Sequence, residues 1–347
     1  MKVKTLLTAL LLLSSSAAFA DSDESKSNED LWKYVPTFNG TFRTFYRLST
    51  ATGESRFEVA NARLVAGGYV LPKVDYRIQV DFCDNGKIKI LDAYARVRPT
   101  TGLALMAGQM RVPLSVEATR DPSLYYFADA SLTNKFGNLR SVGVKAGYTI
   151  PQLPLYFEGG VFNASDMSDH KQWNSALTYS IKANYTTASG IRPEVGFMSR
   201  VPGGSGAGVR VNMLNASLSW KYAGLFVEGE YIYRHYTGNT YADAHAWDFF
   251  VNYDFNVKWP LANVVSLQAR FDGITDASNG LYGKNGTLGT DIDGCRRITA
   301  GITATKIINK TWTSFRINFE QYFYGHSAAK PSASDNNQLV AGLVFHF

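Results

Sequence analysis

Side chains that could perform catalytic or metal chemistry are few in this 347-residue sequence and stand far apart. The glycine-rich run from Gly203 to Gly208 is similar in composition to a phosphate-binding loop, but no helical pattern follows it. The histidines show no spacing typical of a metal site, and the H-E-x-x-H motif is absent. They are His170, His235, His245, His326 and His346. We therefore expect no enzyme activity, no bound metal and no cofactor.

Charged residues are the other candidates for chemistry, and they occur singly among apolar residues. Residues 75–82, 247–255 and 263–272 alternate between apolar and polar side chains. This period of two is typical of β-strands with one apolar and one polar face. Arginines spread in this way, without a patch of exposed aromatic residues, argue against nucleic-acid binding. The sequence therefore predicts an all-β protein whose charges share one side of a sheet.

The predicted strands number sixteen, and their connections alternate between short turns and longer polar segments. Such a layout, with strands of about ten residues, is typical of a transmembrane antiparallel β-barrel and not of a soluble sandwich. Fourteen or eighteen strands are alternatives, because residues 56–70 and 190–200 are weakly patterned. The predicted strands are 37–48, 56–70, 75–83, 87–98, 102–112, 139–150, 155–164, 173–186, 190–200, 209–222, 225–236, 244–256, 263–272, 295–306, 311–324 and 338–347.

The first twenty residues have the three parts of a secretory signal peptide. Lys2 and Lys4 precede an apolar run at residues 6–13, and Ala18-Phe19-Ala20 forms a small-residue cleavage site. The apolar run is shorter than the roughly 20 residues of a spanning helix, which argues against a membrane anchor. We expect export to a bacterial outer membrane. The expected segments are 1–20 (cleaved signal peptide), 21–34 (short periplasmic tail) and 35–347 (barrel).

A sheet survives in hydrocarbon only when it is closed, because every backbone N–H and C=O group needs a partner there. About sixteen strands enclose an aqueous channel, whereas eight would be filled by side chains. The sequence therefore predicts a water-filled pore for small hydrophilic solutes or ions. A sugar-specific channel lined by Tyr94, Tyr125 and Tyr126, or a structural or adhesive barrel without conductance, are the alternatives.

The longest segment without a strand pattern follows the fifth predicted strand. Residues 113–138 combine prolines and tyrosines with charges of both signs. A loop of this length in a compact structure is usually functional. We expect it to fold into the lumen as a constriction loop, with a solvated external loop as the alternative.

The last predicted strand, residues 338–347, is apolar at alternate positions and ends on Phe347. It resembles the C-terminal signature by which outer-membrane barrels are recognised for insertion. This likeness implies that the barrel assembly machinery, and then outer-membrane lipid, are partners of the chain.

Three motifs resemble the phosphate-selective porin O and P family. They are F-E-V-A-N-A-R-L at residues 57–64, L-D-A-Y at residues 91–94 and G-Q-M-R-V-P-L-S-V-E at residues 108–117. The resemblance implies a sixteen-stranded homotrimeric porin whose third loop folds into the lumen. Ala60 and Asn61 stand where phosphate-binding members tend to have paired arginines. The resemblance therefore implies a porin but not phosphate specificity.

Alternation also predicts which charges face the lumen. The strands before residue 150 have an excess of basic over acidic positions, whereas the later strands have a slight acidic excess. Opposite walls of unlike charge would set up a field across the pore, and we hypothesise a weak preference for anions. The predicted pore-lining residues are Arg43, Arg47, Arg77, Asp92, Arg96 and Lys145 on the wall, with Glu117, Arg120 and Asp121 on the constriction loop.

Cys83 and Cys295 both fall at the long-loop ends of predicted strands. Two cysteines in an exported protein suggest a disulfide. Their strands are not neighbours in the predicted order, however, so a disulfide and two free thiols are both open.

Overall fold

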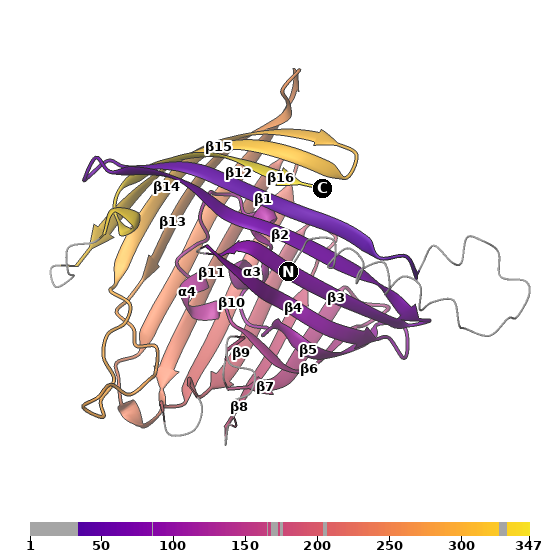
Figure 1. Ribbon diagram of the computed structural model, residues 1–347, viewed down its shortest axis with the longest axis vertical. Coiled ribbons are helices and arrows are strands. Elements are labelled where there is room, and N and C mark those ends of the chain that lie inside the picture. The colour runs from indigo at the N-terminus through magenta and orange to yellow at the C-terminus, as the bar shows by residue number, and fades with distance from the viewer. Residues whose placement is uncertain are drawn as a thin grey trace, which may run out of the picture.

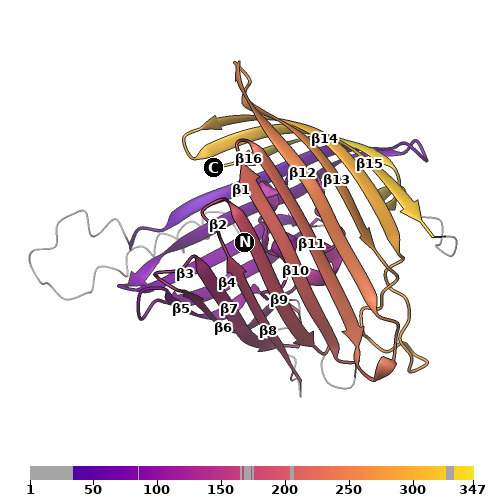
Figure 2. The same ribbon diagram turned by 180° about the vertical axis from the view of Figure 1, so that it is seen from behind.

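The computed structural model describes residues 34–347 except 85, 165, 168–172, 174–175, 204–206 and 326–331. The described residues form a closed antiparallel barrel of sixteen strands, seen from opposite sides in Figures 1 and 2. The strands are β1 (Thr37–Ser49), β2 (Ser55–Leu71), β3 (Val74–Asp84), β4 (Lys87–Val97), β5 (Leu103–Arg111), β6 (Arg140–Thr149), β7 (Leu155–Asn163), β8 (Leu177–Tyr185), β9 (Ile191–Arg200), β10 (Val211–Tyr222), β11 (Leu225–Tyr236), β12 (Ala244–Trp259), β13 (Ala262–Ile274), β14 (Cys295–Ile308), β15 (Thr311–Tyr324) and β16 (Gln338–His346).

The barrel is closed by pairing between the first and last strands. β1 and β16 pair antiparallel from Thr41 opposite His346 to Ser49 opposite Gln338, so the sheet has no free edge. The predicted fold class and number of strands are confirmed. The largest difference in bounds is at β8, which begins at Leu177 and not at residue 173. The predicted signal peptide lies outside the described residues.

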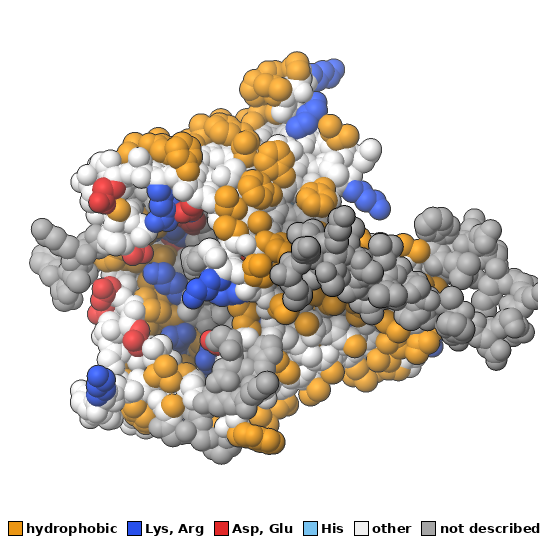
Figure 3. All heavy atoms as spheres, viewed as in Figure 1, with side chains coloured by type: hydrophobic (Ala, Val, Ile, Leu, Met, Phe, Trp, Pro, Cys, Tyr) orange, Lys and Arg blue, Asp and Glu red, His pale blue; other side chains and the backbone are white. Residues whose placement is uncertain are grey.

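Alternate residues of each strand divide between the two faces of the wall. On β14, the outward side chain of Ile302 is 44% exposed, whereas the inward neighbour Thr303 is 4% exposed. Figure 3 shows hydrophobic side chains over the outer wall and charged side chains of both signs gathered toward one end. An apolar outer face and a polar inner face are what a barrel in lipid requires.

Short turns and long connections lie at opposite ends of the barrel. In the turn from β10 to β11, Ala223 and Gly224 both have positive φ, at 44° and 86°. Such a pair is typical of the type I′ turn, whose twist matches that of a two-residue hairpin. Among the described residues, no helix is long and apolar enough to cross a membrane.

We predict that Ile302→Arg, near the middle of the outward face of β14, destabilises the barrel by about 2–4 kcal/mol, because arginine is costly at the bilayer midplane. Thr305→Lys, which adds a charge to the inward face of the same strand, should cost much less. Equilibrium unfolding in urea, with the protein in lipid vesicles, measures both values. Equal destabilisation by the two variants would contradict this assignment of faces.

Candidate functional site

The segment between β5 and β6, residues 112–139, lies inside the barrel (Figure 1), and we name it the inner loop. Its helical elements are α3 (Val116–Thr119), η3 (Pro122–Leu124) and α4 (Asn134–Gly137). Side-chain caps start two of them: Ser115 accepts the N–H of Ala118 at 3.1 Å, and Asp121 accepts the N–H of Ser123 at 2.9 Å. The inner loop is thus built from short capped turns that its own sequence specifies.

Apolar packing seats the inner loop against the wall. Leu114, Phe136 and Leu139 are buried in one cluster with inward-facing side chains of the wall. These wall residues are Phe162, Met198, Val211, Met213, Ile232 and Ile274. At Gly196 of β9, an added Cβ would lie 2.5 Å from the carbonyl oxygen of Leu114, so glycine lets the loop approach this closely. The lumen therefore has an apolar core that the alternation of charges did not predict.

Polar contacts hold the inner loop on the same side. Glu230 accepts the N–H of Val116 at 2.7 Å, and Asp272 accepts the N–H of Leu132 at 2.8 Å. These carboxylates satisfy backbone groups that would otherwise be buried without partners. Since they belong to β11 and β13, the loop is bound to the wall opposite β3–β7.

Arg120 and Asp129 of the inner loop form ion pairs with the wall. Arg120 donates to both carboxylate oxygens of Glu228 at 2.6 and 2.8 Å. Arg47 donates to both carboxylate oxygens of Asp129 at 2.6 Å. Two-bond pairs of this kind fix geometry as well as charge. The inner loop is thus bound to the wall at both Arg120 and Asp129.

The connection between β13 and β14 packs over the long-loop ends of β10 and β11. The hydroxyl of Tyr236 donates to the carbonyl of Ser278 at 2.6 Å, and the N–H of Val209 donates to the carbonyl of Gly280 at 2.9 Å. Ala277, in the same connection, belongs to the apolar core below. The barrel is therefore covered at its long-loop end on the side of β10 and β11.

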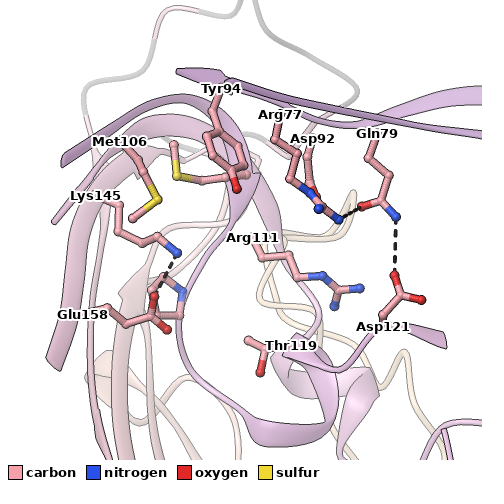
Figure 4. A pocket seen from close by; sticks show the side chains of 12 residues that line it. Arg77, Gln79, Asp92, Tyr94, Met106, Arg111, Thr119, Asp121, Lys145 and Glu158 are labelled. Carbon is pink, nitrogen blue, oxygen red and sulfur yellow. Dashed lines mark hydrogen bonds and ion pairs between the residues drawn. The ribbon is translucent and has the colours of Figure 1, made fainter. Parts of the chain in front are cut away.

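A cavity of about 230 Å³ lies between the inner loop and the wall β3–β7, and we name it the passage. Figure 4 shows side chains from the wall and from the loop facing one another across it. Its lining residues are Arg77, Gln79, Asp92, Tyr94, Met106, Met110, Arg111, Pro113, Thr119, Asp121, Lys145 and Glu158.

The carboxylates of the wall that line the passage are each shared by two cations. Asp92 lies 3.5 Å from Arg77 and 3.0 Å from Arg140. Glu158 lies 2.9 Å from Lys145 and 3.4 Å from Lys182. Arg140 and Lys182 are not among the lining residues, so they neutralise these carboxylates from positions outside the passage.

Arg111 differs from the other lining cations. Among the described residues, no carboxylate oxygen lies within 4.0 Å of its guanidinium, and its Nη1 atom is buried without a hydrogen-bond partner. In Figure 4, its guanidinium points into the passage in the direction of Asp121. Arg111 therefore faces the passage, with Asp121 on the opposite side, and has no direct ion pair among the described residues.

The predicted pore-lining residues divide into three groups. Arg77, Asp92, Lys145 and Asp121 line the passage together. A second group lies instead where the inner loop meets the wall, because its members bind one another, the loop backbone, or the carboxylates of Asp129 and Glu228. It consists of Arg43, Arg47, Glu117 and Arg120. Arg96 pairs with Asp75 at 2.9 Å and is not among the lining residues.

Several lining residues were not predicted. Arg111 and Pro113 belong to the G-Q-M-R-V-P motif, so the motif itself could have pointed to them. Met106 and Met110 carry no charge and gave no signal, since only charged positions were assigned to the lumen. Among the described residues, no group of three or more His, Cys, Asp or Glu side chains is placed to hold a metal ion.

Of the two alternatives left open for the cysteines, the structure has two free thiols. Cys83 is on β3, where its thiol lies 3.3 Å from the carbonyl of Val59. Cys295 is buried at the start of β14, in the apolar core. β3 and β14 are not neighbours in the barrel, and this separation keeps the thiols apart.

The inner loop also shifts the pKa of its own titratable groups. Desolvation raises the pKa of Tyr126 to about 12. Desolvation also disfavours the charged form of Asp129, but the Arg47 guanidinium outweighs it and holds the pKa of that carboxyl well below its usual range. For Asp121, burial is likewise outweighed, here by the N–H of Ser123 and by Arg63, so its pKa is lowered. Asp121 and Asp129 therefore stay charged in mild acid.

We predict that the pair of Arg47 and Asp129 holds the inner loop at pH 4, near the ordinary aspartate pKa of about 3.9. A carboxylate with a lowered pKa stabilises the folded form above its unfolded pKa, and this contribution disappears as the pH falls through the lowered value. Wild-type single-channel currents should therefore show few brief closures at pH 4. Asp129→Asn should show frequent brief closures already at pH 7. A closure frequency equal to that of the wild type would refute the role of the pair.

Solved porins have the same fold as this chain. The anion-selective porin from Comamonas acidovorans superposes with a TM-score of 0.62 at 11% sequence identity, covering 90% of this chain and 99% of that one. In-vitro folded OmpT, an outer membrane protein of Vibrio cholerae, gives 0.59 at 12% identity, covering 94% and 100%. OmpF of Salmonella typhi gives 0.59 at 11% identity, covering 91% and 98%.

Sequence comparison shows a similarity to one family. Residues 38–203 match the profile described as phosphate-selective porin O and P, and no curated protein sequence matches the chain. The matched region contains β1–β9 and the whole inner loop with its passage. With this match over just under half of the chain and a sixteen-stranded porin fold, the chain is similar to the phosphate-selective porin O and P family of outer-membrane channels.

Proposed function

We propose that the channel lets small hydrophilic solutes and ions diffuse passively, with a preference for anions. The observation that carries this proposal is Arg111, whose charge faces the passage without a carboxylate partner. The carboxylates of the wall that could offset it, Asp92 and Glu158, are each bound to a second cation behind the lining. A low-dielectric wall strengthens such a field and raises the local concentration of anions. The similarity in fold to an anion-selective porin is consistent with this preference.

Phosphate specificity is not part of the proposal. Asn61, at the position where the family's phosphate-binding members tend to have an arginine, accepts a hydrogen bond from Arg43 at 2.8 Å and donates one to Asp81 at 2.9 Å. Both contacts are buried, so the Asn61 amide is engaged within the wall.

A sugar-specific channel is less well supported, because the aromatic residues expected to guide sugars do not share the passage. Tyr94 lines it, but Tyr125 is buried and Tyr126 stacks on Phe226 with ring centroids 5.0 Å apart. A single tyrosine offers one stacking surface, whereas a sugar path needs successive ones.

We further propose that the chain assembles as a homotrimer through the outer faces of β4 and β5. These strands have eleven and nine residues, and their outward residues are aliphatic. Lipid-facing walls usually carry aromatic residues at both interfaces, so their absence here favours contact with another protein. Similar porins include a trimer form of OmpT. Cleavage of residues 1–20 on export and insertion by the barrel assembly machinery complete the proposed biogenesis.

We predict that Arg111→Gln lowers the ratio of anion to cation permeability about tenfold, since a unit charge about 6 Å from a permeating ion stabilises an anion by about 0.7 kcal/mol in a water-like dielectric and destabilises a cation equally. Reversal potentials across a KCl gradient in a planar bilayer measure this ratio. The matched control is Arg56→Gln, because Arg56 is exposed at the start of β2 and does not line the passage. A cation preference in the wild type, or equal ratios in both variants, would refute the proposal.

We predict that Ala95→Glu, on the outer face of β4, abolishes the trimer, because a buried unpaired carboxylate at an interface is strongly unfavourable. Ala216→Glu places the same change on the outer face of β10 and should leave the trimer intact. Gel mobility of unheated samples and mass photometry in detergent distinguish trimer from monomer. A trimer that survives Ala95→Glu but not Ala216→Glu would place the interface elsewhere.

A further inference from the structure

Four inward-facing arginines of the wall donate hydrogen bonds to successive carbonyl groups of the inner loop. They project from β1, β13, β14 and β15, and each is at most 9% exposed. We name them the clamp arginines. They are Arg43, Arg270, Arg297 and Arg316.

The carbonyls that they bind belong to residues 127–130 of the inner loop. Arg316 donates to the carbonyl of Phe127 at 3.1 Å, and Arg43 donates to that of Ala128. Arg270 donates to the carbonyl of Asp129 at 2.9 Å, and Arg297 donates to that of Ala130 at 2.7 Å. Each of four consecutive carbonyls is thus bound by a different arginine.

Two of the clamp arginines depend on these carbonyls for compensation of their charge. Among the described residues, neither Arg43 nor Arg316 has a carboxylate oxygen within 4.0 Å. Within the described part of the chain, the other hydrogen bond of Arg43 goes to the Asn61 amide oxygen, and its guanidinium carbon lies 5.1 and 5.3 Å from the ring centroids of Phe45 and Tyr125. The other hydrogen bond of Arg316 goes to the carbonyl of Ser123. A buried charge is costly unless it is hydrogen-bonded. The loop therefore satisfies these arginines, and they in turn hold the loop.

Arg270 and Arg297 are compensated differently. Arg297 binds Asp272 at 2.7 Å and Glu320 at 3.2 Å, and Arg270 lies over the ring of Phe127 with its guanidinium carbon 4.4 Å from the centroid. Arg270 also lies 3.6 Å from Asp272 and 3.8 Å from Glu320, so both arginines share these two buried carboxylates, and removing either arginine would leave the carboxylates with a single cation. Arg43 and Arg316 are therefore the residues at which loop binding can be tested separately from folding.

The clamp is linked to the passage through η3. Arg316 binds the carbonyl of Ser123, whose N–H is bound by Asp121, and Asp121 lines the passage. No clamp arginine is itself a lining residue. If residues 127–130 leave the wall, the space into which the loop can move is the passage.

We propose that the clamp arginines are positioning residues, which keep the passage open by holding residues 127–130 against the wall, and that they do not contact permeating ions. This inference rests on the proposed function only in requiring that the chain conducts. It assigns a mechanical role to inward arginines whose charge would otherwise suggest a path for anions.

The test compares Arg316→Met and the double variant Arg43→Met/Arg316→Met with wild type in planar bilayers. Methionine removes the donors at similar length and leaves no buried carboxylate unpaired. Each lost bond from a charged donor should raise the frequency of brief closures about tenfold, while the open-state reversal potential stays unchanged. Arg316→Lys, which keeps a charged donor, should close less often than Arg316→Met.

Arg96→Met is the matched control, because Arg96 is an inward arginine that pairs with Asp75 and not with the inner loop. It should produce no extra closures. A shift of the reversal potential toward cations without closures in Arg316→Met would overturn the proposal, since that result identifies an ion-contacting arginine. A wild type without current would instead refute the proposed function.

A chemical readout tests loop release directly. Ala128 is 1% exposed, so Ala128→Cys in a background of Cys83→Ser and Cys295→Ala should resist a water-soluble thiol reagent. The same cysteine should be labelled at least about tenfold faster when Arg43 and Arg316 are methionine. Heat-shifted gel mobility verifies that each variant is folded, and equal labelling rates in folded variants would overturn the clamp.

Discussion

The structure depends on one constraint: a backbone N–H or C=O group in hydrocarbon must find its partner within the protein. Pairing of β1 with β16 meets this constraint by removing the last edge of the sheet. Closure then divides every strand into an outward and an inward set of side chains. The alternation of Ile302 and Thr303 on β14 is one example of this division.

The lumen created by closure is occupied unevenly. Buried apolar residues such as Met213 and Ile232 face inward where the inner loop packs, whereas Arg77 and Lys145 face the passage. The inward side chains thus have two separate uses, one to bind the loop and one to line the route. Charge alone does not tell them apart, because Arg297 and Arg111 are both inward arginines with different neighbours.

Ion pairs inside the barrel follow the same division. Arg120 and Glu228 lie between the loop and the wall, where few water molecules can screen them and geometry is fixed by two bonds. Asp92 and Glu158 border the passage and are each shared between a lining cation and a second cation behind it. The proposed preference for anions therefore depends on how these ion pairs are arranged and not on the overall net charge of +6.

The barrel, a number of strands near sixteen and the place of a long loop after the fifth strand could be predicted from the sequence. These features are local: alternation with a period of two and the contrast between short and long connections can be read residue by residue. Inward orientation was also predictable, and Arg77, Asp92 and Lys145 do line the passage. Arg43 and Arg47 were assigned to the same lining, yet they bind the inner loop.

Which inward residues meet the loop could not be predicted from the sequence, because this depends on the wall against which the loop packs. The contacts join residues far apart in the sequence, such as Leu114 with Gly196 and Ala128 with Arg43. Periodicity specifies the side of a strand on which a residue lies but not what stands opposite it. The same limit applies to the cysteines, whose separation follows from the order of strands around the closed barrel.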